Sequence, residues 1–61
     1  MVSELVVYEG DNEAIICTPE SEANMLKEYF ADHTGREKED YDRHISEGPV
    51  QVSAKMRVKS Y

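Results

Sequence analysis

The fold is decided by the stretch SELVVYEGDNEAIIC, residues 3–17. Its two halves are rich in β-branched and aromatic residues, and between them Gly10, Asp11 and Asn12 form a compact turn signal. Two such runs joined by a short glycine-containing loop are typical of an antiparallel hairpin. We therefore predict strands over residues 3–9 and 13–17.

The residues after the hairpin predict a helix. Thr18 suits the N-cap position, and Pro19 suits the first helical position because proline has no N–H to leave unpaired. Gly35 is the residue type that ends helices. Between these signals, apolar residues recur at three- and four-residue steps and predict the face that packs on the sheet: Ala23, Leu26, Phe30 and His33.

Residues 36–47 predict a second, short helix that is weakly anchored. Most of this segment is charged. Its inward stripe consists of Tyr41, His44 and Ile45. Gly48 and Pro49 end it, since glycine takes the C-terminal cap and proline cannot extend a helix.

The last twelve residues, 50–61, alternate between apolar and polar side chains and predict a long strand. The apolar face carries Val50, Val52, Ala54, Met56 and Val58. The polar face carries Gln51, Ser53, Lys55, Arg57, Lys59 and Tyr61. A strand with one packed and one wet face belongs to an antiparallel or mixed sheet.

These elements predict one α+β domain over residues 1–61, a small two-layer fold of order ββααβ with one or two helices and a three-stranded antiparallel or mixed sheet. Tracing the directions makes the last strand antiparallel to the second strand and parallel to the first. It could pair beside either one. The expected core is Leu5, Val7, Ile15, Leu26, Phe30, Ile45, Val52, Ala54, Met56 and Val58.

The length of 61 residues limits stability, because a domain of this size buries only about 60% of the surface that its unfolded chain exposes. Small domains are often stabilised by disulfides, a metal or self-association, and the single cysteine excludes an internal disulfide. We therefore expect self-association more strongly than in a larger domain. Residues 1–4 lack a basic segment followed by an apolar one, and no apolar run comes near the length of about 20 residues that spans a bilayer. We therefore expect a cytoplasmic protein without a signal peptide or membrane contact.

The sequence predicts neither an enzyme nor a metal or cofactor site. Cys17 ends a strand before a helix, a position that can stabilise a thiolate, but it has no second cysteine and no nearby cation in the sequence, so we expect a buried thiol. His33 and His44 are too few for a zinc site, which needs about four ligands. The many carboxylates lack the concave apolar site that would separate two pKa values.

Charge is segregated along the chain. Residues 1–49 carry all thirteen carboxylates against four cations, a formal −9, whereas residues 50–61 carry +3. In the simplest interpretation the charges have no specific function: the carboxylates keep the domain soluble, and the cations of the last strand pair with Glu4, Glu9 or Glu13 across the sheet. The functional interpretation is an acidic surface for a protein partner with a basic surface, including one that ordinarily holds nucleic acid. The expected contact residues are Glu28, Asp32, Glu37, Glu39, Asp40, Asp42, Glu47 and Tyr61.

Two functions follow from these patterns. The first is a non-catalytic inhibitor or modulator that binds its partner through the acidic helical face, in imitation of nucleic-acid charge. The second is a structural or regulatory homodimer assembled by edge-strand pairing. Direct binding of DNA or RNA is disfavoured by the net charge of −6. The salt dependence of binding distinguishes the two functions, because binding through the acidic face weakens steeply with ionic strength and strand pairing does not.

Overall fold

The N-terminal hairpin forms as the sequence predicts. In the computed structural model, β1 (Leu5–Glu9) and β2 (Glu13–Cys17) pair in antiparallel fashion. The Gly10 N–H donates to the Glu13 carbonyl at 2.7 Å and closes the turn. The structure describes residues 4–30 and 37–61, and the α+β class is confirmed.

The helix begins later than predicted. It comprises α1 (Glu22–Met25) and the π-helical turn η1 (Leu26–Phe30), and its N-cap is Ser21 rather than Thr18. The Ser21 N–H donates to the Thr18 carbonyl at 3.1 Å and to the Thr18 Oγ1 at 3.2 Å. This turn holds Pro19 ahead of the helix, so the predictions for Thr18 and Pro19 are wrong.

The helix packs on the sheet through a face next to the predicted stripe. Met25 and Tyr29 are buried, Leu26 and Phe30 are half-buried, and Ala23 is exposed. A π turn takes more residues than an α turn and so shifts the inward face along the sequence. The predicted contributions of His33 and Gly35 lie outside the described residues.

The predicted second helix is wrong over its described part. Residues Lys38–Asp40 form a single 3₁₀ turn, η2, and β3 (Asp42–Ser46) is a strand that pairs antiparallel with β1. β1 has a second edge whose backbone groups need partners, and this segment supplies them. Tertiary pairing overrides the helix propensity of the charged residues.

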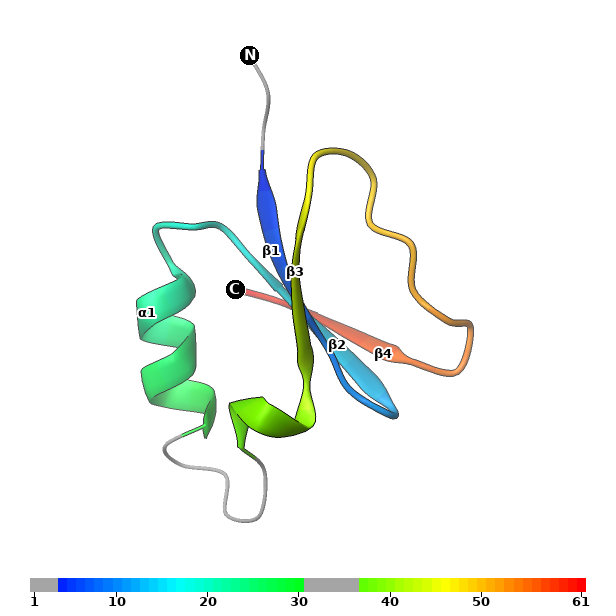
Figure 1. Ribbon diagram of the computed structural model, residues 1–61, viewed down its shortest axis with the longest axis horizontal. Coiled ribbons are helices and arrows are strands. Elements are labelled where there is room, and N and C mark those ends of the chain that lie inside the picture. The colour runs from blue at the N-terminus through cyan, green and yellow to red at the C-terminus, as the bar shows by residue number, and fades with distance from the viewer. Residues whose placement is uncertain (1–3, 31–36) are drawn as a thin grey trace.

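The last strand, β4 (Arg57–Ser60), is shorter than predicted, and it is parallel to β2 rather than antiparallel. β3 runs parallel to β2, the direction expected for the second helix, and residues 47–56, of which 50–56 were expected to begin the last strand, instead return the chain to the start of β4. The sheet therefore has four strands in the order β3-β1-β2-β4 and is mixed. In Figure 1, α1 lies on one side of this sheet, and the connection from β3 to β4 runs along the other.

The core lies between the helix and the hairpin. It contains Val6, Tyr8, Ile15, Cys17, Met25, Tyr29 and Tyr41. Of the predicted core, Val7 and Ile15 are buried, whereas Ile45 is 41% and Val58 is 49% exposed, and Ala54 is exposed too. Ile45 and Val58 stay exposed because they lie on the edge strands, each with a neighbouring strand on one side only.

Candidate functional site

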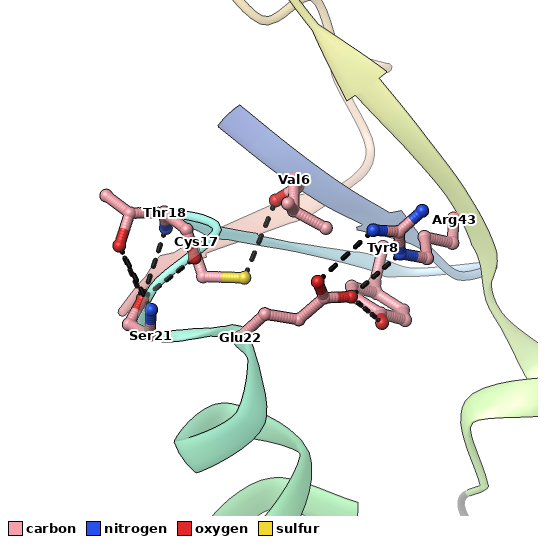
Figure 2. A network of polar contacts seen from close by, with 7 residues as sticks. All are labelled: Val6, Tyr8, Cys17, Thr18, Ser21, Glu22 and Arg43. Atoms are coloured by element: carbon pink, nitrogen blue, oxygen red, sulfur yellow. Dashed lines mark hydrogen bonds and ion pairs between the residues drawn. The ribbon is translucent and has the colours of Figure 1, made fainter. Parts of the chain in front are cut away.

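A polar network joins the helix to two strands (Figure 2). Glu22 lies in the first turn of α1, and Tyr8 and Arg43 are paired neighbours on β1 and β3. The Tyr8 hydroxyl donates to the Glu22 carboxylate, and Arg43 grips the same carboxylate with Nε at 2.7 Å from Oε2 and Nη2 at 3.2 Å from Oε1. This bidentate geometry is the strong form of a charged hydrogen bond.

The network fixes the protonation of its members near neutral pH. The hydrogen bonds from Arg43 and Tyr8 lower the pKa of Glu22. Burial, with the Glu22 hydrogen bond and charge, raises the pKa of Tyr8 to about 12. Glu22 is thus ionised and Tyr8 protonated, which suits a structural clamp between helix and sheet.

Cys17 lies beside this network at the end of β2 (Figure 2), and the expectation of a buried thiol is confirmed. The side chain is 1% exposed, and its Sγ lies 3.7 Å from the Val6 carbonyl oxygen as a weak hydrogen-bond donor. Burial, and then the charge of Glu22, raise the pKa of the thiol. A buried neutral thiol is a small hydrophobic side chain.

Four of the predicted contact residues gather within one short segment. Glu37, Glu39, Asp40 and Asp42 are all exposed, around η2 and at the start of β3. The Asp40 N–H donates to the Glu37 carbonyl at 2.9 Å, and the Glu37 N–H donates to Asp40 Oδ2 at 3.4 Å. These bonds fix the turn. The carboxylates thus project from a 3₁₀ turn and an edge strand, not from the predicted helix.

A fifth carboxylate, Glu9, joins this group and was missed by the sequence reasoning. It lies opposite Asp42 across β1 and β3, and its Oε1 is 2.6 Å from His44 Nε2. Its role depends on a strand pairing that the predicted helix ruled out, so no sequence signal could have found it. We name this surface the acidic end of the sheet: Glu9, Glu37, Glu39, Asp40 and Asp42.

The other predicted contact residues lie apart from the acidic end. Glu28 is exposed on η1, and Glu47 follows β3 at the end away from Asp42, about 16 Å along the strand at 3.3 Å per residue. Tyr61 is 45% exposed, and its ring meets the Tyr29 ring edge-on at 6.4 Å. Asp32 lies outside the described residues.

Arg57 and Lys59 of β4, which we name the basic stripe, lie on the opposite edge of the sheet. Lys59 on β4 places its Nζ 3.6 Å from Glu13 Oε2 and 5.0 Å from the centre of the Tyr29 ring. Arg57 is the strand partner of Glu13. The expected pairing of a β4 cation with Glu13 is confirmed, and Arg57 and Lys59 lie on the edge of the sheet opposite the acidic end.

No group of three or more metal-binding side chains occurs in residues 4–30 and 37–61, and no helix there is long and apolar enough to cross a membrane. Comparison with protein families, curated proteins and solved structures finds no match to this chain.

Proposed function

We propose that this protein binds a basic surface of another protein through the acidic end of the sheet and acts as a non-catalytic inhibitor or modulator. The observation that supports the proposal is the density of negative charge: residues 37–42 hold four exposed carboxylates against one exposed cation, Lys38, and the half-buried Glu9 lies beside them. Glu28, Glu47 and Tyr61 lie apart from this group and are exposed, so they stay secondary contact candidates, and Asp32 lies outside the described residues.

The acidic end is held on a firm frame. Tyr41, between Asp40 and Asp42, is 8% exposed and packs edge-on against Phe30 at 5.2 Å and Tyr29 at 6.4 Å. A buried aromatic anchor fixes the backbone on which the flanking carboxylates stand. Binding therefore has little backbone to order in this segment, which lowers its entropic cost.

The arrangement also carries unfavourable charge that a partner would offset. Glu9 and Asp42 are directly opposite on one face, and like charges at such a position destabilise a sheet by a few tenths of a kcal/mol. A basic partner would relieve this repulsion. Surfaces that hold nucleic acid are basic and recognise closely spaced negative charge, so they are the partner class that we propose.

The test reverses Glu39, Asp40 and Asp42 to lysine. Affinity capture from native extract at low and high salt first supplies the partner, and titration with the purified partner then measures affinity. We expect binding to weaken more than tenfold and the salt dependence of the association rate to flatten, because the steering field is lost. Reversal of Glu4, Asp11 and Glu20, which are also exposed, is the control of equal charge. Unchanged affinity and salt slope in the first variant would mean that the carboxylates only solvate the surface.

A second candidate function is the homodimer assembled by edge-strand pairing. The sheet order supports it, because β3 and β4 are both edge strands and most of their side chains are exposed. Edge strands present unpaired backbone groups to another chain.

A further inference from the structure

The direction of the backbone groups on β3 follows from the hairpin. The Gly10 N–H donates to the Glu13 carbonyl, so the even-numbered residues of β1 direct their backbone groups to β2 and the odd-numbered ones to β3. The odd-numbered residues of β1 pair with even-numbered residues of β3, as Val7 does with His44. The even-numbered residues of β3 therefore direct their backbone groups to β1. The backbone N–H and C=O of Arg43 and Ile45 consequently point to the open edge.

The side chain of Ile45 adds an apolar contact to this edge. It is 41% exposed and lies opposite buried Val6, on the helix-bearing face of the sheet. Arg43 lies on the same face, and Glu47 follows the strand by one residue, at the first position of a bend. The edge thus carries, at two-residue steps in the sequence, a cation that also holds Glu22 through Nε and Nη2, an isoleucine and a carboxylate.

We propose that two copies of this chain pair antiparallel through β3, with Ile45 opposite Ile45 and Arg43 opposite Glu47 of the partner copy. The pairing joins two four-stranded sheets into one. It deepens the second candidate function by naming the strand and the register, and it does not depend on a partner for the acidic end.

The register follows from which side chains meet. Antiparallel pairing that uses the outward backbone groups of β3 can shift only by two residues at a time. The other registers place Arg43 opposite Arg43, Arg43 opposite Ile45, or Ile45 opposite Glu47. Only the register with Ile45 at the two-fold axis pairs an apolar side chain with its own copy. On each side of that axis the same register places Arg43 of one copy opposite Glu47 of the other, which are charges of unlike sign.

The other edge strand is poorly suited to pairing with its own copy. The Arg57 N–H donates to the Asn12 carbonyl at 2.9 Å and the Tyr61 N–H to the Ile16 carbonyl at 2.8 Å, so Val58 and Ser60 direct their backbone groups outward. The antiparallel registers centred on Val58, Lys59 and Arg57 then place Arg57 opposite Lys59, Lys59 opposite Lys59, and Arg57 opposite Arg57, and the register centred on Ser60 pairs only residues 59–61. Like charges directly opposite destabilise a strand pair.

Pairing of β3 with β4 of another copy lacks the same complementarity. In a continuous sheet with both helices on one side, Arg43 and Ile45 would share a face with Arg57 and Lys59, since Lys59 is paired with core residue Ile15. A cation would then neighbour cations. Self-pairing of β3 is the arrangement that the charges favour.

The dimer is expected to be weak, because a single pair of five-residue strands forms a small interface. Sedimentation equilibrium of the purified chain should show the apparent mass rising with concentration from 7.0 kDa toward twice that value. Hydrogen exchange of the Arg43 and Ile45 amides should slow over the same concentration range. A chain that stays monomeric at its highest soluble concentration would overturn the proposal.

Two variant pairs locate the interface. We expect Ile45→Lys to weaken dimerisation at least tenfold, whereas Val58→Lys, at a similarly exposed β-branched residue on the other edge, leaves it unchanged. We expect Glu47→Lys to weaken it and Glu20→Lys, an equal charge change at an exposed residue ahead of α1, to have no effect. Circular dichroism checks that each variant is folded. Because Glu47 lies outside the strands and the core, we expect its substitution to leave the fold intact. Dissociation by Val58→Lys but not by Ile45→Lys would overturn the proposal in favour of β4. Since the purified chain alone is used, failure here leaves the partner test of the acidic end unaffected.

Discussion

At the scale of single residues, Gly10 is required by a close contact rather than by the turn alone. A Cβ at this position would lie 2.6 Å from Tyr41 Cε2 and 2.9 Å from Tyr41 Cδ2. We expect Gly10→Ala to lower the free energy of unfolding by about 1–3 kcal/mol, the cost of overpacking, measured as a shift of the urea midpoint. Gly48→Ala is the control, because nothing lies within 4 Å of the added methyl group. Equal midpoints for the two variants would show that the Tyr41 ring can move aside.

Glu22 is the residue at which the fold should be sensitive to acid. Its folded-state pKa is lowered by Arg43 and Tyr8, so the stabilisation from its ionised form is present above the ordinary pKa of glutamate, about 4.3, and is lost as the pH falls through the lowered value. We expect Glu22→Gln to be less stable than the wild type at neutral pH and to show a shallower loss of stability below pH 4. Unfolding by urea across pH 2–7 measures both. Glu28→Gln, on an exposed side chain, is the control, and an acid limb equally steep in Glu22→Gln and wild type would contradict the assignment.

At the scale of elements, the sequence predicted the hairpin and the helix, which local signals determine. It missed the strand β3, which is determined by pairing with a distant part of the chain. Gly10 to Asn12 between two β-rich runs was enough for the hairpin, and the helix after Cys17 was found, although Ser21 rather than Thr18 caps it. Tyr41, His44 and Ile45 have helical spacing in a segment of helix-forming residues, yet β1 needs a strand on its second edge. Because β3 is an edge strand with one neighbour, its side chains are mostly polar and its sequence lacks a strand pattern.

β3 and a helix differ in how their amides exchange. In β3, the amides of His44 and Ser46 face β1, whereas those of Arg43 and Ile45 face the open edge. At low protein concentration we expect slow hydrogen exchange at His44 and Ser46 and fast exchange at Arg43 and Ile45, an alternation with a period of two. Nuclear magnetic resonance measures each amide. A helix over residues 36–47 would instead protect successive amides beyond its first turn, and that result would contradict β3.

At the scale of the whole molecule, the sequence predicted the segregation of charge but not its placement. The segments that carry −9 and +3 were evident from the order of residues. That the acidic end and the basic stripe lie on opposite edges of one sheet depends on the strand order β3-β1-β2-β4. Glu9 and Asp42 are 33 positions apart in the chain, and only the pairing of β1 with β3 brings them together.

The same charge distribution predicts how salt affects folding. The described ion pairs, such as Glu22 with Arg43 and Glu13 with Lys59, weaken when salt screens them, whereas the repulsion within a chain of net charge −6 also weakens. The pairs are few and mostly at the surface, where each is worth about 0–1 kcal/mol, and the unbalanced carboxylates outnumber them. We therefore expect the urea midpoint of unfolding to rise as NaCl is increased from about 0.01 to 1 M, over which the Debye length falls from about 30 to 3 Å. Urea is the denaturant of choice because it is uncharged and does not screen.

The control is the variant with Glu39, Asp40 and Asp42 changed to lysine, in which each reversal adds two charges and the net charge of −6 becomes zero. Its midpoint should be flat or should fall with salt, since the repulsion has gone and the ion pairs remain. A wild-type midpoint that falls with salt would mean that the ion pairs outweigh the repulsion, and the acidic end would then impose no cost for a basic partner to offset.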